Sequence, residues 1–266
     1  MSENETTTAE ETAVTTLARF EVPSRLEKIE DPNDPNHLTF VAEPFENGYG
    51  HTLGNSLRRV LLGSLEGAAI TSVRIAGAQH EFSSLPGVVE DVTEIVLNLK
   101  KVKFKHHGKE PRLLSLRVHK QGVVTAADIA DDTTYQVVNP DQIICTLDQD
   151  TMFECEFQVR VGRGFATGDE NKVPDMPIGV IPIDSIFSPV TRVKYSVQNT
   201  RVGQMTDYDK LTLEVWTDGR ISPADAMLQA SAILRHHLDV FVNYDDNQVN
   251  FEEAPSAVQD LSLIHI

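Results

Sequence analysis

The sequence has almost none of the features that mark secreted, membrane or redox proteins. Only two of its 266 residues are cysteines, Cys145 and Cys155, and their spacing fits no paired metal or redox motif. We expect both thiols to be reduced and buried, as is usual in the cytoplasm. No apolar run approaches the roughly 18 residues of a membrane helix, and residues 1–6 are too acidic for a secretory signal. The sequence therefore predicts a cytoplasmic protein without membrane contact.

Positive charge is also scarce. Lys and Arg number 23 against 40 Asp and Glu, which gives a net charge of −17. This balance disfavours DNA binding over a broad surface, because DNA affinity depends on neutralising phosphates, but it permits basic protein partners. Residues 100–105 are a local exception, with four lysines around two apolar residues. This run could contact DNA. We favour a strand with a solvated face, in which lysines protect a sheet edge from aggregation.

Metal and catalytic motifs are missing as well. Adjacent histidines occur at 106–107 and 236–237, and neighbouring helix residues point about 100° apart, so a pair cannot readily bind one metal. Residues 148–159 lack the glycine and the glutamate of a calcium loop, and no G-x-S-x-G hydrolase motif occurs. We expect no metal, no cofactor and no catalytic residue.

The chain is organised around residues 38–65. Residues 38–42 alternate as a half-buried strand does, and a turn follows in which Gly48 and Gly50 can take positive φ. The next segment is a predicted helix, and small residues inside it, Gly54 and Ser56, would let another backbone approach closely. We therefore interpret this helix as a docking surface. Its apolar face repeats every 3.6 residues and consists of Leu53, Leu57, Val60, Leu61 and Leu65.

Two kinds of partner can be considered for this helix. A nucleotide would need a phosphate-binding loop, but residues 48–54 read G-x-G-x-x-x-G instead of G-x-G-x-x-G, and no Gly-Lys-Ser/Thr follows. A protein partner would use Arg58 and Arg59, which are either exposed helix arginines or interface anchors of the kind enriched at binding hot spots. We favour the protein partner.

The rest of the chain predicts an α+β fold with an insertion. The middle reads as short strands and turns, and two long strands follow it. Residues 90–99 could form a strand or an amphipathic helix, and the i, i+3, i+4, i+7 spacing of Val92, Ile95, Val96 and Leu99 favours the helix. Ser222 and Pro223 then start a helix. The expected divisions are a disordered acidic tail (1–16), a discontinuous α/β dimerisation domain (17–67 and 188–243), an inserted β-rich domain (68–187) and a linker with an artefactual end (244–266).

The last helix has an unusually wide apolar surface. Such a surface is either enclosed in the core of one domain or buried between two subunits, and the pattern alone leaves both possibilities open. One apolar stripe consists of Met227, Ala230, Leu234, Leu238 and Phe241, and a second of Ala226, Ile233 and Val240.

Several long motifs, taken together, resemble one family. They lie in order at residues 51–62 (His-Thr-Leu-Gly-Asn-Ser-Leu-Arg-Arg-Val-Leu-Leu), 80–83, 90–100, 124–129, 162–165, 187–190 and 206–211. Residues 17–244 thereby resemble the N-terminal, assembly-forming region of the bacterial DNA-directed RNA polymerase alpha subunit. Motifs in this number and order are far more specific than one short pattern.

The resemblance implies a non-catalytic scaffold. It would form a homodimer and nucleate assembly of the beta and beta-prime subunits, with nucleotidyl transfer carried out in beta-prime. The implied contact with beta is Arg59, with Arg58 and Leu62 beside it. The implied dimer interface is formed by Leu53, Leu57, Leu61, Met227, Ala230, Leu234, Leu238 and Phe241.

The resemblance also bears on two further segments. By their chemistry, Arg160, Gly162, Arg163 and Gly164 could bind an anion or a carboxylate-bearing partner, and the resemblance favours docking to the large catalytic subunits. Promoter DNA and activators would be contacted only through a C-terminal domain that is missing here. Residues 261–266 look like a translated sequencing adaptor, so we expect that the gene was cut there.

Overall fold

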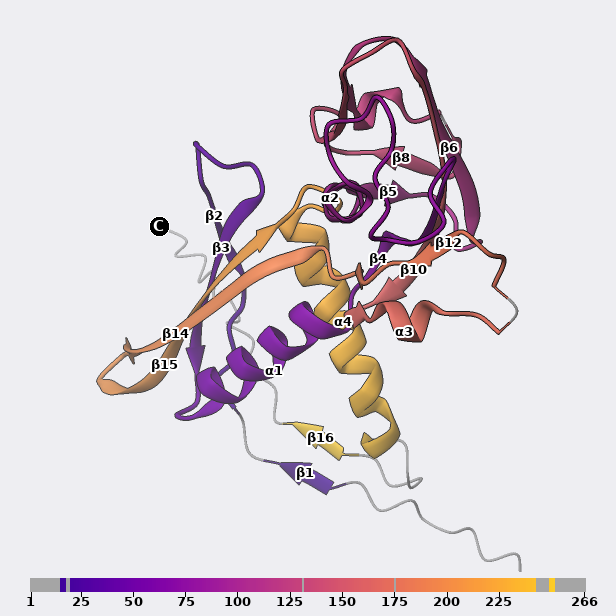
Figure 1. The fold of residues 1–266 in the computed structure, drawn as a ribbon. Helices are drawn as coiled ribbons and strands as arrows, with labels where there is room; N and C mark the ends of the chain where they lie inside the picture. The colour runs from indigo at the N-terminus through magenta and orange to yellow at the C-terminus, as the bar shows by residue number, and fades with distance from the viewer. Residues whose placement is uncertain (1–14, 18–19, 131, 175, 243–248, 252–266) are drawn as a thin grey trace, which may run out of the picture.

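Two main sheets with separate cores make up the protein (Figure 1). The computed structural model describes residues 15–17, 20–130, 132–174, 176–242 and 249–251. The first described strand, β1 (Thr15–Leu17), pairs with the last described strand, β16 (Val249–Phe251). It enters a β-rich part through β4 and leaves it before β14. The predicted α+β class with an inserted β-rich unit is confirmed.

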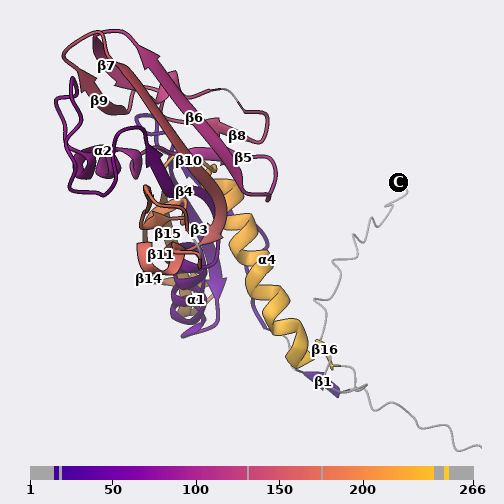
Figure 2. The same ribbon diagram turned by 45° about the vertical axis from the view of Figure 1, so that its right-hand side comes forward.

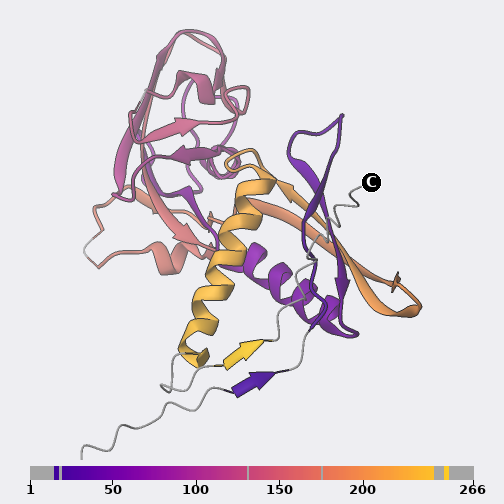
Figure 3. The ribbon, with the colours of Figure 1, turned by 180° about the vertical axis from the view of Figure 1, so that it is seen from behind.

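The four-stranded sheet carries two long helices on one face (Figure 3). Its strands run in the order β14-β15-β3-β2 and are all antiparallel. Leu211, Leu213 and Val215 alternate with outward residues, so one face of β15 points into the core. The elements are β2 (Glu27–Glu30), β3 (His37–Phe45), α1 (Tyr49–Gly63), β14 (Val190–Val202), β15 (Met205–Thr217) and α4 (Pro223–Val242).

The β-rich part is built on a second sheet in the order β6-β10-β4-β5-β8, with β12 paired to β4. Its core includes fully buried Phe104, Leu116 and Phe157. The elements are β4 (Glu66–Ile75), α2 (Val92–Leu99), β5 (Phe104–His106), β6 (Arg112–His119), β7 (Gly122–Thr125), η1 (Ala126–Asp128), β8 (Tyr135–Val137), β9 (Ile143–Leu147), β10 (Met152–Arg163), β11 (Phe165–Ala166), α3 (Gly168–Asn171), β12 (Val180–Pro182) and β13 (Ser185–Ile186).

Local sequence signals explain α2 and the start of α4. The Asp91 carboxylate accepts a hydrogen bond from the Glu94 backbone N–H at 2.8 Å and thereby caps α2. The Ser222 hydroxyl accepts one from the Asp225 N–H at 3.1 Å ahead of α4, as predicted. None of the helices in the described ranges is long and apolar enough to span a bilayer.

The two cysteines are buried free thiols, as predicted. Both lie in the core of the β-rich part. Burial in apolar surroundings raises the pKa of the Cys145 thiol to about 12. It also raises the pKa of the Cys155 thiol. Both sulfurs therefore stay protonated and unreactive at neutral pH.

The start of α1 differs from its prediction. Only Gly48 has positive φ, 87°, whereas Gly50 lies inside the helix. The Asp209 carboxylate of β15 accepts hydrogen bonds from the N–H groups of Gly48 (2.8 Å) and Gly50 (3.1 Å), so a distant strand caps the helix. A Cβ at Gly54 would lie 2.7 Å from the Tyr195 ring. Gly54 thus allows α1 to pack on its own sheet, and its interpretation as an approach point for a partner was wrong.

The chain is irregular between Phe20 and Leu26, and pairing into the four-stranded sheet begins at β2. The strand prediction for the lysine run was largely wrong. In the lysine run, only Phe104–His106 is a strand, and β4 and β8 flank it on both sides, so it is not a sheet edge. Lys100 instead forms an ion pair with Asp184, with a 2.8 Å N–O distance. Within the predicted disordered tail (1–16) and linker (244–266), residues 15–16 and 249–251 instead belong to the paired strands β1 and β16, and the other residues of the tail and all other residues of the linker lie outside the described ranges.

Candidate protein-docking surfaces

The outer face of α1 presents polar side chains to solvent. His51, Asn55 and Arg59 are exposed and four residues apart, so they form one stripe along the helix. Arg58, also exposed, donates from Nε to the Val193 carbonyl at 3.4 Å. Within the described ranges, no hydrogen bond or ion pair is found for Arg59. Its guanidinium therefore keeps all five donors available to a partner.

The predicted dimer residues fall into three groups by burial. Leu61, Met227 and Ala230 are 0%, 6% and 0% exposed in the core between α1, α4 and the sheet. Their prediction as partner contacts was wrong, because they have almost no surface left to bury. Half-buried residues form the second group: Leu53, Leu57, Leu62 (predicted as a contact with beta) and Leu234. The third group, Leu238 and Phe241, is exposed.

The C-terminal half of α4 carries a cluster of exposed apolar side chains. Figure 2 shows this half extending away from both sheets. Leu238, Val240, Phe241 and Val242 are 52%, 67%, 72% and 71% exposed. Leu238, Phe241 and Val242 lie on one face of the helix at i, i+3 and i+4, and exposed apolar patches are typical of interaction sites. Periodicity predicted Leu238 and Phe241 but did not separate them from the core positions of the same helix.

The segment 160–164 is less open than predicted. Arg160 donates from Nη2 to Asn171 Oδ1 at 2.8 Å and stacks over the Phe187 ring at 5.9 Å. Gly162 lies within β10, where a Cβ would be 2.9 Å from the same ring. Gly162 is therefore a packed strand residue, whereas Gly164 turns with φ 61°.

Arg163 is the exposed arginine of that segment. Its side chain is 65% exposed and donates to Glu66 Oε1 at 2.7 Å, and Lys109 binds the other carboxylate oxygen at 2.8 Å. These two cations, Lys109 first, lower the pKa of the Glu66 carboxyl. An exposed ion pair of this kind is weak, so Arg163 can exchange its carboxylate partner at little cost.

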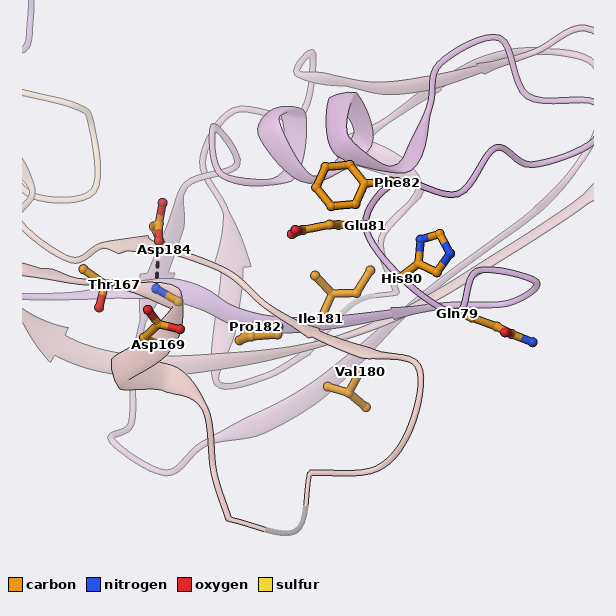
Figure 4. A pocket seen from close by; sticks show the side chains of 11 residues that line it. Gln79, His80, Glu81, Phe82, Thr167, Asp169, Val180, Ile181, Pro182 and Asp184 are labelled. Atoms are coloured by element: carbon orange, nitrogen blue, oxygen red, sulfur yellow. Dashed lines mark hydrogen bonds between the residues drawn. The ribbon is translucent and has the colours of Figure 1, made fainter.

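Sequence reasoning did not find a surface hollow of about 660 Å³ beside β12 (Figure 4). Exposed Phe82 stands on one wall, and Asp184 lies at the opposite end. Asp184 accepts from Lys100 Nζ at 2.8 Å and from the Gly168 N–H at 2.7 Å. The Lys100 hydrogen bond is the larger cause of its lowered pKa. No group of metal-binding side chains occurs in the part of the chain that the structure describes.

The fold and these sites define an α+β protein with an inserted β-rich part and with exposed arginine and apolar surfaces. The family described as "RNA polymerase Rpb3/RpoA insert domain" matches residues 73–188. DNA-directed RNA polymerase subunit alpha of Symbiobacterium thermophilum is 52% identical over 228 residues, which cover 86% of this chain and 72% of that protein. The Moorella thermoacetica subunit is 53% identical over 237 residues, covering 86% and 76%.

The chain belongs to the family of DNA-directed RNA polymerase alpha subunits. It is therefore a subunit of DNA-directed RNA polymerase and a member of that complex. The resemblance inferred from the ordered motifs is confirmed. Neither rival interpretation gains support from the fold, because Gly50 and Gly54 pack against β14 and β15 and Lys100 is already paired with Asp184.

Proposed function

We propose that the chain is a non-catalytic assembly platform. Two copies associate through α1 and α4, and each copy then presents its surfaces to a different large subunit, one to beta and the other to beta-prime. The dimerisation domain consists of residues 17–67 and 188–243, and residues 68–187 form the inserted domain. Nucleotidyl transfer takes place in beta-prime, which supplies the acidic metal ligands that this chemistry needs.

The observation that carries the dimer proposal is the exposed apolar end of α4. Leu234, one turn before it on α4, is only half-buried, and so are Leu53 and Leu57 on α1, the helix that α4 contacts. A two-fold dimer places the same patch of both copies together, so each apolar side chain contributes twice. Burial of this patch removes the largest unfavourable surface of α4 from water.

Contact with beta is proposed for Arg59. Arginine combines a planar fork of donors with an apolar stem, and it is enriched where interface energy concentrates. Arg58 and Leu62 flank it on α1 and complete the contact. Arg163 and Gly164, at the end of β10, provide a further docking point for the large subunits, since the exposed Arg163–Glu66 pair can open toward a partner.

Co-purification with a cognate beta subunit tests the Arg59 assignment. Arg59→Ala should weaken capture by about 30-fold, corresponding to about 2 kcal/mol for a hot-spot residue. It should leave folding and dimer mass unchanged, because no described residue depends on the Arg59 side chain for a hydrogen bond. Arg117→Ala is the matched control, since the Arg117 side chain is 61% exposed and, among the described residues, is found bonded to Glu154 alone. Equal capture by both variants and the wild type would refute the assignment.

A further inference from the structure

The turn between β15 and α4 contains a buried arginine that sequence reasoning did not single out. Arg220 is 7% exposed. Its Nε donates to both carboxylate oxygens of Asp218, at 2.9 and 3.1 Å. Nη2 also lies 2.8 Å from Asp218 Oδ2. The charge is therefore compensated inside the protein, as burial of a guanidinium requires.

The remaining donors of Arg220 reach the two places where the chain crosses between the sheets. Nη1 donates to the Ala68 carbonyl at 2.8 Å, near the start of β4, where the chain enters the β-rich part. Nη1 and Nη2 also donate to the carbonyls of Ile186 (3.4 Å) and Ser188 (2.7 Å), where the chain leaves it. One guanidinium thus holds both crossing segments together.

The crossing segments are also in direct backbone contact. A Cβ on Gly67 would lie 2.0 Å from the Phe187 carbonyl oxygen, a distance that no side chain tolerates. The N–H groups of Phe187 and Ser188 both donate to the Gly164 carbonyl, at 2.9 and 3.1 Å. We call this region, residues 66–68, 164, 186–189 and 218–220, the junction.

The β-rich part also contacts the Arg220 turn through its own side chains. Lys103 Nζ lies 3.7 Å from Asp218 Oδ2, and a Cβ on Gly219 would lie 3.2 Å from Val138. Desolvation, followed by the charge of Arg220, lowers the pKa of the Lys103 amine. The carboxylate of Asp218 therefore faces one cation from its own turn and a second cation from the β-rich part.

We propose that Arg220 is a positioning residue that fixes the orientation of the β-rich part relative to the four-stranded sheet and its helices. A lysine could not replace it, because only a planar fork of donors can reach three carbonyls and one carboxylate at once. Pro223 begins α4 three residues later, so the same turn ties the dimer helix to the junction. The consequence for assembly rests on the proposed function: docking points on α1 and on β10 keep one fixed spacing for a large subunit.

Hydrogen exchange followed by mass spectrometry on the intact dimer tests this inference. In Arg220→Gln, exchange in peptides covering 186–190 should accelerate by about tenfold or more, because the junction opens locally. Peptides containing Phe157 and Leu213, in the two sheet cores, should exchange as in the wild type. Arg117→Gln is the control for losing an exposed arginine. If Arg220→Gln does not fold, Asp218→Asn tests the same contact and keeps the guanidinium.

The outcomes separate this proposal from the proposed function. Unchanged exchange at 186–190, or acceleration spread equally over Phe157 and Leu213, would overturn a positioning role. Arg220→Gln should also capture less beta subunit than the wild type, while its dimer mass stays the same. If this variant shows accelerated exchange at 186–190 but captures beta as well as the wild type does, the link to assembly is overturned. A third outcome is also informative: Arg220→Gln shows the local acceleration, but the wild-type chain does not bind beta. That result would contradict the platform function and leave the role of Arg220 at the junction standing.

Discussion

Removal of the exposed aromatic ring at the end of α4 should dissociate the proposed dimer. Phe241 is 72% exposed in the protomer. Full burial of a phenylalanine side chain contributes up to about 3 kcal/mol, so burial of the exposed share contributes about 2 kcal/mol per copy. A two-fold interface contains the residue twice, which gives about 4 kcal/mol for the dimer. Phe241→Ala should therefore raise the dimer dissociation constant by about 1,000-fold.

Sedimentation equilibrium over a range of protein concentrations measures that constant. Leu113→Ala is the matched control, because Leu113 is 68% exposed but lies on β6 in the other sheet. Both variants should keep the wild-type far-ultraviolet circular dichroism, since neither side chain contributes to a core. A Phe241→Ala dissociation constant within about threefold of the wild-type value, or an equal effect of Leu113→Ala, would refute the reasoning that this patch is the dimer interface.

The remaining predictions concern stability. Asp209→Ala removes the acceptor of two N–H groups at the start of α1, so the free energy of unfolding in urea should fall by about 1–2 kcal/mol at fixed protein concentration. Asp209→Asn, which keeps one acceptor oxygen, should lose less, and equal losses would contradict the capping role. Asp184 has a lowered pKa because of Lys100, so its ionised form stabilises the fold. Above about pH 4 the wild type should have a larger free energy of unfolding than Asp184→Asn, and this difference should vanish as the pH falls further and the Asp184 carboxylate is protonated. A difference that persists in acid would contradict this linkage.

Local chemistry made the helices predictable. In α2, Asp91 caps the first turn, and Val92, Ile95 and Leu99 are all buried, as their spacing indicated. In β15, apolar residues alternate with polar ones along the sequence, and the apolar residues Leu211, Leu213 and Val215 are the buried ones. These signals depend on neighbours within one turn or one strand, so the sequence contains them in full.

Long-range placement was not predictable in the same way. Periodicity identified the apolar face of α4, but Met227 and Ala230 face the core of their own protomer, whereas Phe241 faces solvent. The helix simply extends past its sheet, and no local pattern records where the sheet ends. The prediction that the lysine run lies at a sheet edge failed for a related reason. The strands that flank β5, which are β4 and β8, come from distant segments of the chain.

The Arg220 contacts show the same limit. Asp218 and Gly219 form a dipeptide typical of turns, and the chain bends there with Gly219 at φ 90°. The carbonyls that Arg220 binds are 32 to 152 residues away along the chain. A buried arginine of this kind looks like any surface arginine until the crossing segments are brought together.

The composition of the assembled complex tests the central claim most directly. The chain would be combined with cognate beta and beta-prime subunits, and the intact assembly weighed by native mass spectrometry. An asymmetric platform predicts two copies of this chain for one beta and one beta-prime, because the two identical surfaces of the dimer bind different partners. Complexes with one copy of the chain, or with two copies of each large subunit, would contradict it.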